Sequence, residues 1–157
     1  MKYFIFSFLF LFLFSGLLFS QKTSVLFIGN SYTYVNDLPT TFKDLSLSLG
    51  DTVSTDQSTP GGARFLDHAV NTTTLTKIAA EDWDFVVLQA QSQEPSWSPS
   101  QMETEVFPYA EVLVDSIKSN NICTEPVFFM TWGRKYGDDM NCDVWPAVCT
   151  LLVMHEK

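Results

Sequence analysis

Short, continuous apolar runs separated by longer polar stretches set the pattern of most of this chain. Runs of this length that stop at a glycine or a polar residue are typical of strands buried on both faces, and three occur, at 24–29, 84–89 and 126–131. A weaker strand, rich in β-branched residues, is predicted at 52–57. Apolar positions at helical spacing predict intervening helices at 37–49, 63–71, 73–80 and 98–119. This alternation predicts an α/β domain with a parallel, doubly wound sheet.

The first twenty residues have a different pattern. Lys2 precedes an apolar run from 3 to 19, and Ser20 follows as a small residue at its exit. These features are typical of a secretory signal peptide, so we expect cleavage after Ser20 and a secreted or periplasmic protein without a stable membrane span. The alternative is an uncleaved anchor, because the run is close to the roughly 18 residues that cross a bilayer. Residues 21–157 are expected to form one domain.

The exported chain is acidic. Without Lys2, eight Lys and Arg residues remain against eighteen Asp and Glu residues, which gives a net charge of about −10. Proteins bind phosphate backbones through clustered Lys and Arg, so this charge disfavours nucleic acid as a partner. The acidic residues are scattered along the chain, which is typical of a solvated surface.

Three cysteines follow the apolar leader. Cys142 and Cys149 lie seven residues apart, a spacing that predicts a disulfide in an oxidising compartment and leaves Cys123 over. A metal site needs more ligands at regular spacing, and the sequence offers only His68 and His155 beside the cysteines. We therefore expect a disulfide rather than a metal.

Three of the predicted strands are followed by a polar or glycine-rich segment: Gly29-Asn-Ser31, Pro60-Gly-Gly62 and Gln89-Ala-Gln91. Open α/β sheets bind ligands at the carboxyl ends of their strands, where these segments should meet. A serine there, beside preorganised N–H donors, has the chemistry of acyl transfer. The alternatives are that the serine caps a helix, that the glycines form an ordinary turn, and that the glutamines cap loop backbone.

The same segments carry a resemblance to a known family. The sequence Phe-Ile-Gly-Asn-Ser-Tyr-Thr resembles the first block of SGNH (GDSL-like) hydrolases, where Gly-Asp/Asn-Ser carries the nucleophile. Gly61-Gly62 stands in the place of the second block, and residues 84–91 stand in the place of the third. Two stretches, Val-Val-Leu-Gln-x-Gln-Ser-Gln and Thr-Trp-Gly-Arg…Met-Asn-Cys-x-Val-Trp-Pro, are similar to a bacterial SGNH-like subgroup. The resemblance spans residues 24–150.

This resemblance implies a fold and a set of roles. The fold would be a flavodoxin-like three-layer sandwich, and Ser31 would be the nucleophile. The oxyanion hole would consist of the Ser31 N–H, the Gly62 N–H and the side chain of Gln91. Gln91 stands where the family has Asn, so its longer side chain must fold back, and Gln89 is a rival for the role.

The general base is the part of the family's pattern that is missing. The family takes it from an Asp-x-x-His block after a fifth strand, and His155 has Leu152, not Asp, three residues before it. Asp67 precedes His68, but adjacent residues on a helix point about 100° apart. We therefore expect a sandwich that is incomplete at the C-terminus, an exposed sheet edge and impaired catalysis.

Taken together, the resemblance implies a serine esterase that cleaves short acyl or acetyl esters, including those of carbohydrates. We expect neither cofactor nor metal. Trp132 and Tyr136 are candidates for a substrate rim, with core packing as the alternative. A non-catalytic, secreted carbohydrate-binding module on the same fold is the alternative function, and a purely structural secreted domain is a third.

Overall fold

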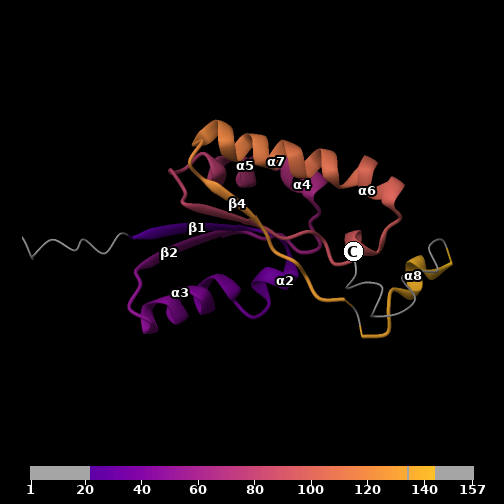
Figure 1. Cartoon of the computed structure of the whole chain (residues 1–157), viewed down its shortest axis with the longest axis horizontal. Helices are drawn as coiled ribbons and strands as arrows, with labels where there is room; N and C mark the ends of the chain where they lie inside the picture. Colours follow the sequence, from indigo (N-terminus) through magenta and orange to yellow (C-terminus); the bar gives the residue numbers. More distant parts are fainter. Residues whose placement is uncertain (1–21, 134, 144–157) are drawn as a thin grey trace, which may run out of the picture.

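A four-stranded parallel sheet forms the centre of the molecule. The computed structural model describes residues 22–133 and 135–143. Its strands lie in the order β2-β1-β3-β4 (Figure 1) and are β1 (Thr23–Ile28), β2 (Val53–Ser58), β3 (Phe85–Leu88) and β4 (Glu125–Phe128). All four predicted strands are present and every neighbouring pair is parallel, which confirms the predicted doubly wound α/β fold.

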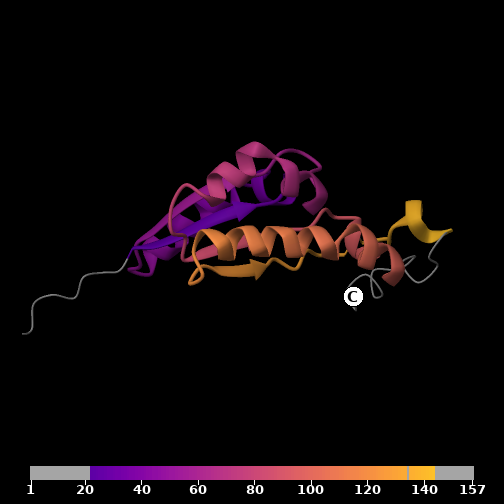
Figure 2. The same cartoon turned by 90° about the horizontal axis from the view of Figure 1, so that it is seen from above.

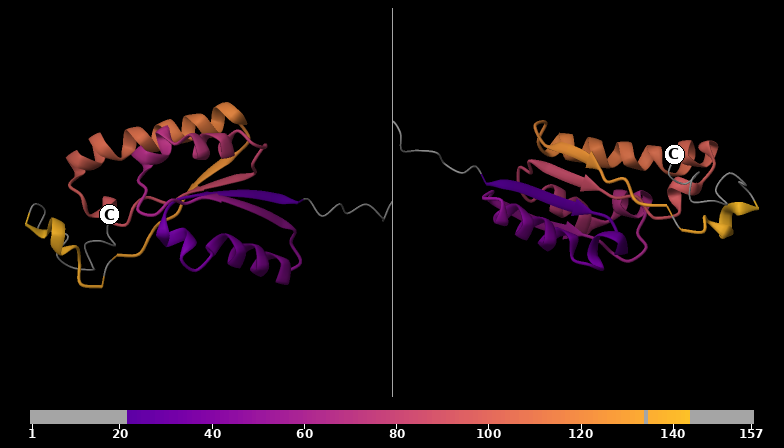
Figure 3. Two further views of the ribbon diagram at one scale, coloured as in Figure 1. Left: turned by 180° about the vertical axis from the view of Figure 1, so that it is seen from behind. Right: turned by 60° about the horizontal axis from the view of Figure 1, so that its bottom comes forward.

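Helices cover both faces of the sheet and complete three layers. One face carries α2 (Ser31–Tyr34) and α3 (Leu38–Ser48), which connect β1 to β2. The opposite face (Figures 1 and 3) carries α4 (Phe65–Val70), α5 (Thr72–Ile78), α6 (Pro99–Glu105) and α7 (Phe107–Asn120). A short 3₁₀ turn, η1 (Glu94–Ser96), precedes α6, and α8 (Asp139–Cys142) follows β4. Seen from above, α7 runs beside β4 (Figure 2).

The helix predicted at 98–119 is two helices. The chain leaves helical geometry at Val106, with φ −122° and ψ −59°, and resumes it at Phe107. Pro108 explains the break, because proline has no N–H to donate and its ring clashes with the carbonyl of the preceding turn. The Val106 side chain at the break is buried in the core.

Alternating side chains of β1 fill two separate layers of core. Leu26 and Ile28 pack with Leu88 of β3 and with Leu113 and Ile117 of α7. On the other face, a smaller cluster beneath α3 is made by Val25, Phe27 and Val53. Because β1 is buried on both faces, its carboxyl end is held firmly, and this end carries the Gly-Asn-Ser turn.

β4 is the outer strand on its side of the sheet, and no described strand pairs with its free edge. Phe128 is 55 % exposed and Met130 is 84 % exposed. An apolar groove of about 650 Å³ lies between this edge and α6 and α7, with Phe128, Met102 and Val114 in its walls. Within 22–133 and 135–143, no helix has the length and apolar character that crossing a bilayer requires.

Some predictions concern residues outside the described ranges. The signal peptide predicted at 1–20 and the histidine at 155 both lie there. So does Cys149, and the disulfide predicted between Cys142 and Cys149 therefore stays a prediction. Cys123 is a free, exposed thiol.

Candidate active site

Ser31 lies directly beyond the buried end of β1. Asn30 is the N-cap of α2, with its Oδ1 accepting the Tyr32 N–H at 3.1 Å, so Ser31 is the first helical residue rather than the cap. This assignment rules out the capping alternative for the serine. The Ser31 side chain is half-buried, and no described residue forms a hydrogen bond with its hydroxyl. Neither its hydroxyl nor its own N–H has a hydrogen-bond partner among the described residues.

The turn that carries Ser31 is anchored by Gln89. The Gln89 side chain is 1 % exposed, and its Oε1 accepts the Asn30 N–H at 2.9 Å and the Thr33 hydroxyl at 3.0 Å. Its Nε2 donates to the carbonyl of Ala90. Both ends of this amide are therefore bonded inside the protein, so Gln89 holds the turn together.

The glycine pair forms a tight turn beside Asn30. The Ala63 N–H donates to the Pro60 carbonyl at 3.2 Å, and Gly62 has φ +71°, the left-handed value that the third residue of a type II turn requires. The carbonyl of Ala63 accepts from Asn30 Nδ2 at 3.0 Å, and this bond is buried. The second turn is thus fastened to the first, and no described residue accepts the Gly62 N–H.

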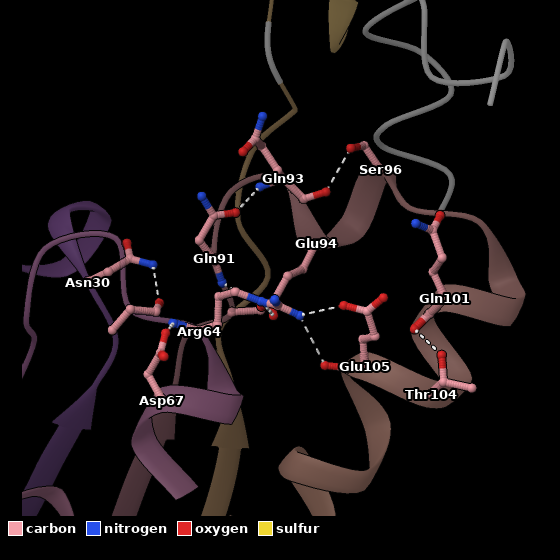
Figure 4. Close-up of polar contacts among 12 residues, drawn as sticks. Asn30, Arg64, Asp67, Gln91, Gln93, Glu94, Ser96, Gln101, Thr104 and Glu105 are labelled. Carbon is pink, nitrogen blue, oxygen red and sulfur yellow. Dashed lines mark hydrogen bonds and ion pairs between the residues drawn. The ribbon is translucent and has the colours of Figure 1, made fainter. Parts of the chain in front are cut away.

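The third turn presents the Gln91 side chain. Gln91 Oε1 accepts the Gln93 N–H at 2.5 Å, so the carbonyl end of this amide is engaged and the NH₂ end points away from it (Figure 4). The Gln91 backbone N–H donates to Glu94 Oε2 at 2.8 Å. A side chain held in this way offers a donor at the edge where the other two turns lie.

A buried ion pair joins the second turn to the third. Arg64 Nε donates to Glu94 Oε1 at 3.0 Å, and the Glu94 side chain is fully buried (Figure 4). The Arg64 guanidinium also lies 4.4 Å from the centre of the Trp97 ring and reaches Glu105 Oε2 at 3.3 Å. Burial raises the pKa of Glu94, while the bonds from Arg64 and from the Gln91 N–H oppose that rise.

His68 supports the turn that carries Ser31. Its side chain is fully buried, and Nε2 donates to the Gly29 carbonyl at 2.9 Å. With Nε2 protonated, Nδ1 accepts from the Thr74 hydroxyl at 2.9 Å, and Thr74 in turn accepts from the Ser58 hydroxyl at 2.8 Å. Burial lowers the pKa of His68, which favours this neutral form. Both ring nitrogens are occupied, so His68 is a packed core residue.

Two aromatic rings stack beside the turn that carries Ser31. Tyr32 and Trp132 stack with their centroids 4.4 Å apart and an interplanar angle of 8°. Trp132 is 54 % exposed and Tyr136 is 81 % exposed, so neither ring belongs to the core. Lys135 Nζ lies 5.2 Å from the centre of the Tyr136 ring. The stack connects Trp132 to Tyr32, the residue next to Ser31, although the two are about a hundred positions apart in sequence.

The three turns are evident from the sequence pattern, but the residues that hold them together are not. Glu94 is the only charged residue between Asp84 and Glu103, and Arg64 is the only Lys or Arg between Lys43 and Lys77. A single carboxylate in an otherwise uncharged segment, and a single cation in a long segment without others, were the available signals for this pair. In the described part of the chain, no three His, Cys, Asp or Glu side chains gather as metal ligands would.

Comparisons with known proteins bear on the fold. A solved structure titled "Crystal Structure of TesA", an SGNH/GDSL thioesterase, is similar to this chain with a TM-score of 0.57 and 10% sequence identity. The similarity covers 85% of this chain and 69% of that chain. No family model matches the chain, and no curated protein matches it either. The chain therefore shares its α/β fold with that structure.

Gly29 is expected to be intolerant of any side chain. A Cβ there would lie 2.6 Å from both Gln89 Oε1 and Thr33 Oγ1, the atoms that hold the turn. We expect Gly29→Ala to lower the free energy of unfolding by about 1–3 kcal/mol, measured by urea denaturation. Gly61→Ala is the matched control, because its Cβ would meet only the Tyr34 hydroxyl at 3.5 Å. Equal losses in the two variants would contradict the packing argument.

The buried imidazole of His68 is expected to make stability depend on pH. The pKa of His68 is lowered in the folded protein, so below the ordinary value of about 6.5 only the unfolded chain takes up this proton. Stability should therefore fall with pH below about 6.5, by at most about 1.4 kcal/mol per pH unit from this group. Urea denaturation between pH 5 and 8 should show this loss in wild type and a shallower one in His68→Gln. The same slope in both proteins would exclude His68 as its source.

Proposed function

We propose that this protein is a serine hydrolase that cleaves short acyl or acetyl esters, including those of carbohydrates. The observation that carries the proposal is the arrangement around Ser31. Its unpaired hydroxyl lies on a turn that is bonded through Asn30 to the turn of Gly62. Arg64 and Glu94 bond that second turn to the turn that presents Gln91. The similarity of the fold to a distant SGNH hydrolase supports the same reading.

In the proposed reaction, Ser31 Oγ attacks the ester carbonyl and forms a tetrahedral intermediate. The N–H groups of Ser31 and Gly62 and the Nε2 of Gln91 donate to its oxyanion, which is where negative charge develops. Collapse breaks the ester C–O bond, and the alcohol leaves with the proton that Ser31 gave up. Water then attacks the acyl-serine by the same route, releases the acid and restores the hydroxyl.

The proton transfer is the slow part of this scheme. A serine hydroxyl is a poor nucleophile unless a base accepts its proton. Both ring nitrogens of His68 are already hydrogen-bonded, to Thr74 and to the Gly29 carbonyl, so this imidazole cannot accept the proton. His155 lies outside the described residues. We therefore expect slow turnover, with a reactive serine that a strong electrophile can still trap.

The aromatic rim favours a flat or ring-shaped alcohol. Tyr32 and Trp132 stack face to face, and more than half of the Trp132 side chain is exposed. Exposed aromatic faces of this kind pack against the apolar faces of sugar rings. The same exposure favours the second candidate function, a carbohydrate-binding module without catalysis. Calorimetric binding of a sugar that survives Ser31→Ala, together with no reaction at Ser31, would favour that second function.

Covalent labelling tests the nucleophile directly. A fluorophosphonate probe should form a bond from Ser31 Oγ to phosphorus with loss of fluoride, and mass spectrometry should place the adduct on the peptide that contains Ser31. Ser31→Ala should abolish the adduct. Ser116→Ala is the matched control, because that hydroxyl bonds only to Val112 O on the exposed side of α7. An adduct that persists in Ser31→Ala would remove Ser31 as the nucleophile.

The third donor is tested by the rate of the same reaction. Gln91→Leu removes the NH₂ group, and loss of one oxyanion donor typically slows the chemical step about 10²-fold. We expect a decrease of that order in the second-order labelling rate constant. Gln93→Ala should label at the wild-type rate, because Gln91 accepts from the backbone N–H of residue 93 rather than from its side chain. A labelling rate unchanged in Gln91→Leu would exclude Gln91 from the oxyanion hole.

A further inference from the structure

We infer that Glu94 is a positioning residue, whose ionised carboxylate fixes the two turns that donate to the oxyanion. The effect of Glu94 on catalysis rests on the proposed function, because only that function assigns donors to the two turns. Its physical basis, the bonds of one carboxylate to two separate loops, is independent of that function.

The two oxygens of Glu94 are divided between two loops that are far apart in sequence. Oε1 accepts from Arg64 Nε at 3.0 Å, two residues after Gly62. Oε2 accepts from the Gln91 backbone N–H at 2.8 Å (Figure 4). One buried group therefore sets the distance between the loop of the second donor and the loop of the third. Neither bond involves the proposed donor atoms, so Glu94 acts through other residues.

Only an ionised carboxylate offers an unprotonated oxygen to each of the two donors. Each oxygen of the anion accepts, whereas a protonated acid or an amide has one group that must donate. Arg64 Nε and the Gln91 N–H are both donors, so a Gln at this position faces one of them with its own NH₂. The donor left without an acceptor must then shift, and the oxyanion site shifts with it. Oxyanion stabilisation depends on preorganised donors, so small displacements lower the rate.

Protonation of Glu94 should have the same effect as this substitution. The charged groups around its carboxylate are Arg64, which pairs with it, and Asp67, which repels it. Glu105 binds the outer side of the Arg64 guanidinium. Burial raises the pKa of Glu94, so the carboxylate gains its proton at a higher pH than an exposed glutamate does. The reactivity of Ser31 should therefore decrease on the acid side as Glu94 is protonated.

Two isosteric variants separate this role from a general effect of charge near Arg64. Glu94→Gln breaks one of the two bonds that join Arg64 to Gln91, whereas Glu105→Gln removes the other acidic partner of Arg64 and leaves both bonds intact. We expect Glu94→Gln to slow fluorophosphonate labelling at least about 10-fold and to lose the acid limb of its pH profile. Glu105→Gln should keep that limb and label within about twofold of wild type. Equal effects in the two variants would overturn the inference.

A second measurement uses wild type and does not depend on catalysis or on the folding of a variant. In an NMR titration, the Gln91 amide resonance should move with the same apparent pKa as the Glu94 side-chain carboxyl carbon. If the carboxyl titrates and the Gln91 amide does not follow it, the positioning role is overturned. Absence of labelling in wild type would instead overturn the proposed hydrolase function, and the titration would still decide the role of Glu94.

Discussion

The hydrogen bonds that hold the end of β1 are the constraint on which the rest of the site depends. Gly29 donates its N–H to Ser58 and accepts at its carbonyl from His68, and the next N–H, that of Asn30, donates to Gln89. Each of these buried groups would cost about 1–3 kcal/mol if it were left without a partner. The strand therefore ends in one conformation, and the following residue is presented at the edge of the sheet.

The three turns at this edge are cross-linked by side chains rather than by the sheet alone. Asn30 binds the carbonyl of Ala63, and the ion pair of Arg64 with Glu94 continues to the backbone of Gln91. Parallel strands bring the turns to one edge, but their hydrogen bonds stop where the strands stop. Buried polar groups must find partners within reach, and here they find them in the neighbouring turns. The donors are thus ordered before any ligand arrives.

In the proposed site, oxyanion stabilisation and general-base catalysis, which usually occur together in a serine hydrolase, are separated. Under the proposed function the turns supply donors and a serine hydroxyl, while both ring nitrogens of His68 are hydrogen-bonded within the fold. Oxyanion stabilisation alone retains part of the rate enhancement of a serine hydrolase, which is consistent with a reactive but slow site. The stacked pair of Tyr32 and Trp132 adds the surface on which the proposed alcohol group would pack. The proposed function draws on both features.

The sequence by itself determined the four strands, their parallel pairing and the edge at which the three turns meet, because continuous apolar runs report burial and alternation with helices restricts topology. It also contained the reason for the break between α6 and α7, since Pro108 cannot continue a helix. Only the tertiary structure decided that Gln89 points inward, that His68 is a core residue and that Glu94 bridges two loops. The bonds of Gln89 to Asn30, of Arg64 to Glu94 and of His68 to Gly29 join residues that are 30 to 59 positions apart. A local sequence pattern does not indicate which residues so far apart will meet. Packing selects which buried donor meets which acceptor, and that selection exists only in the folded chain.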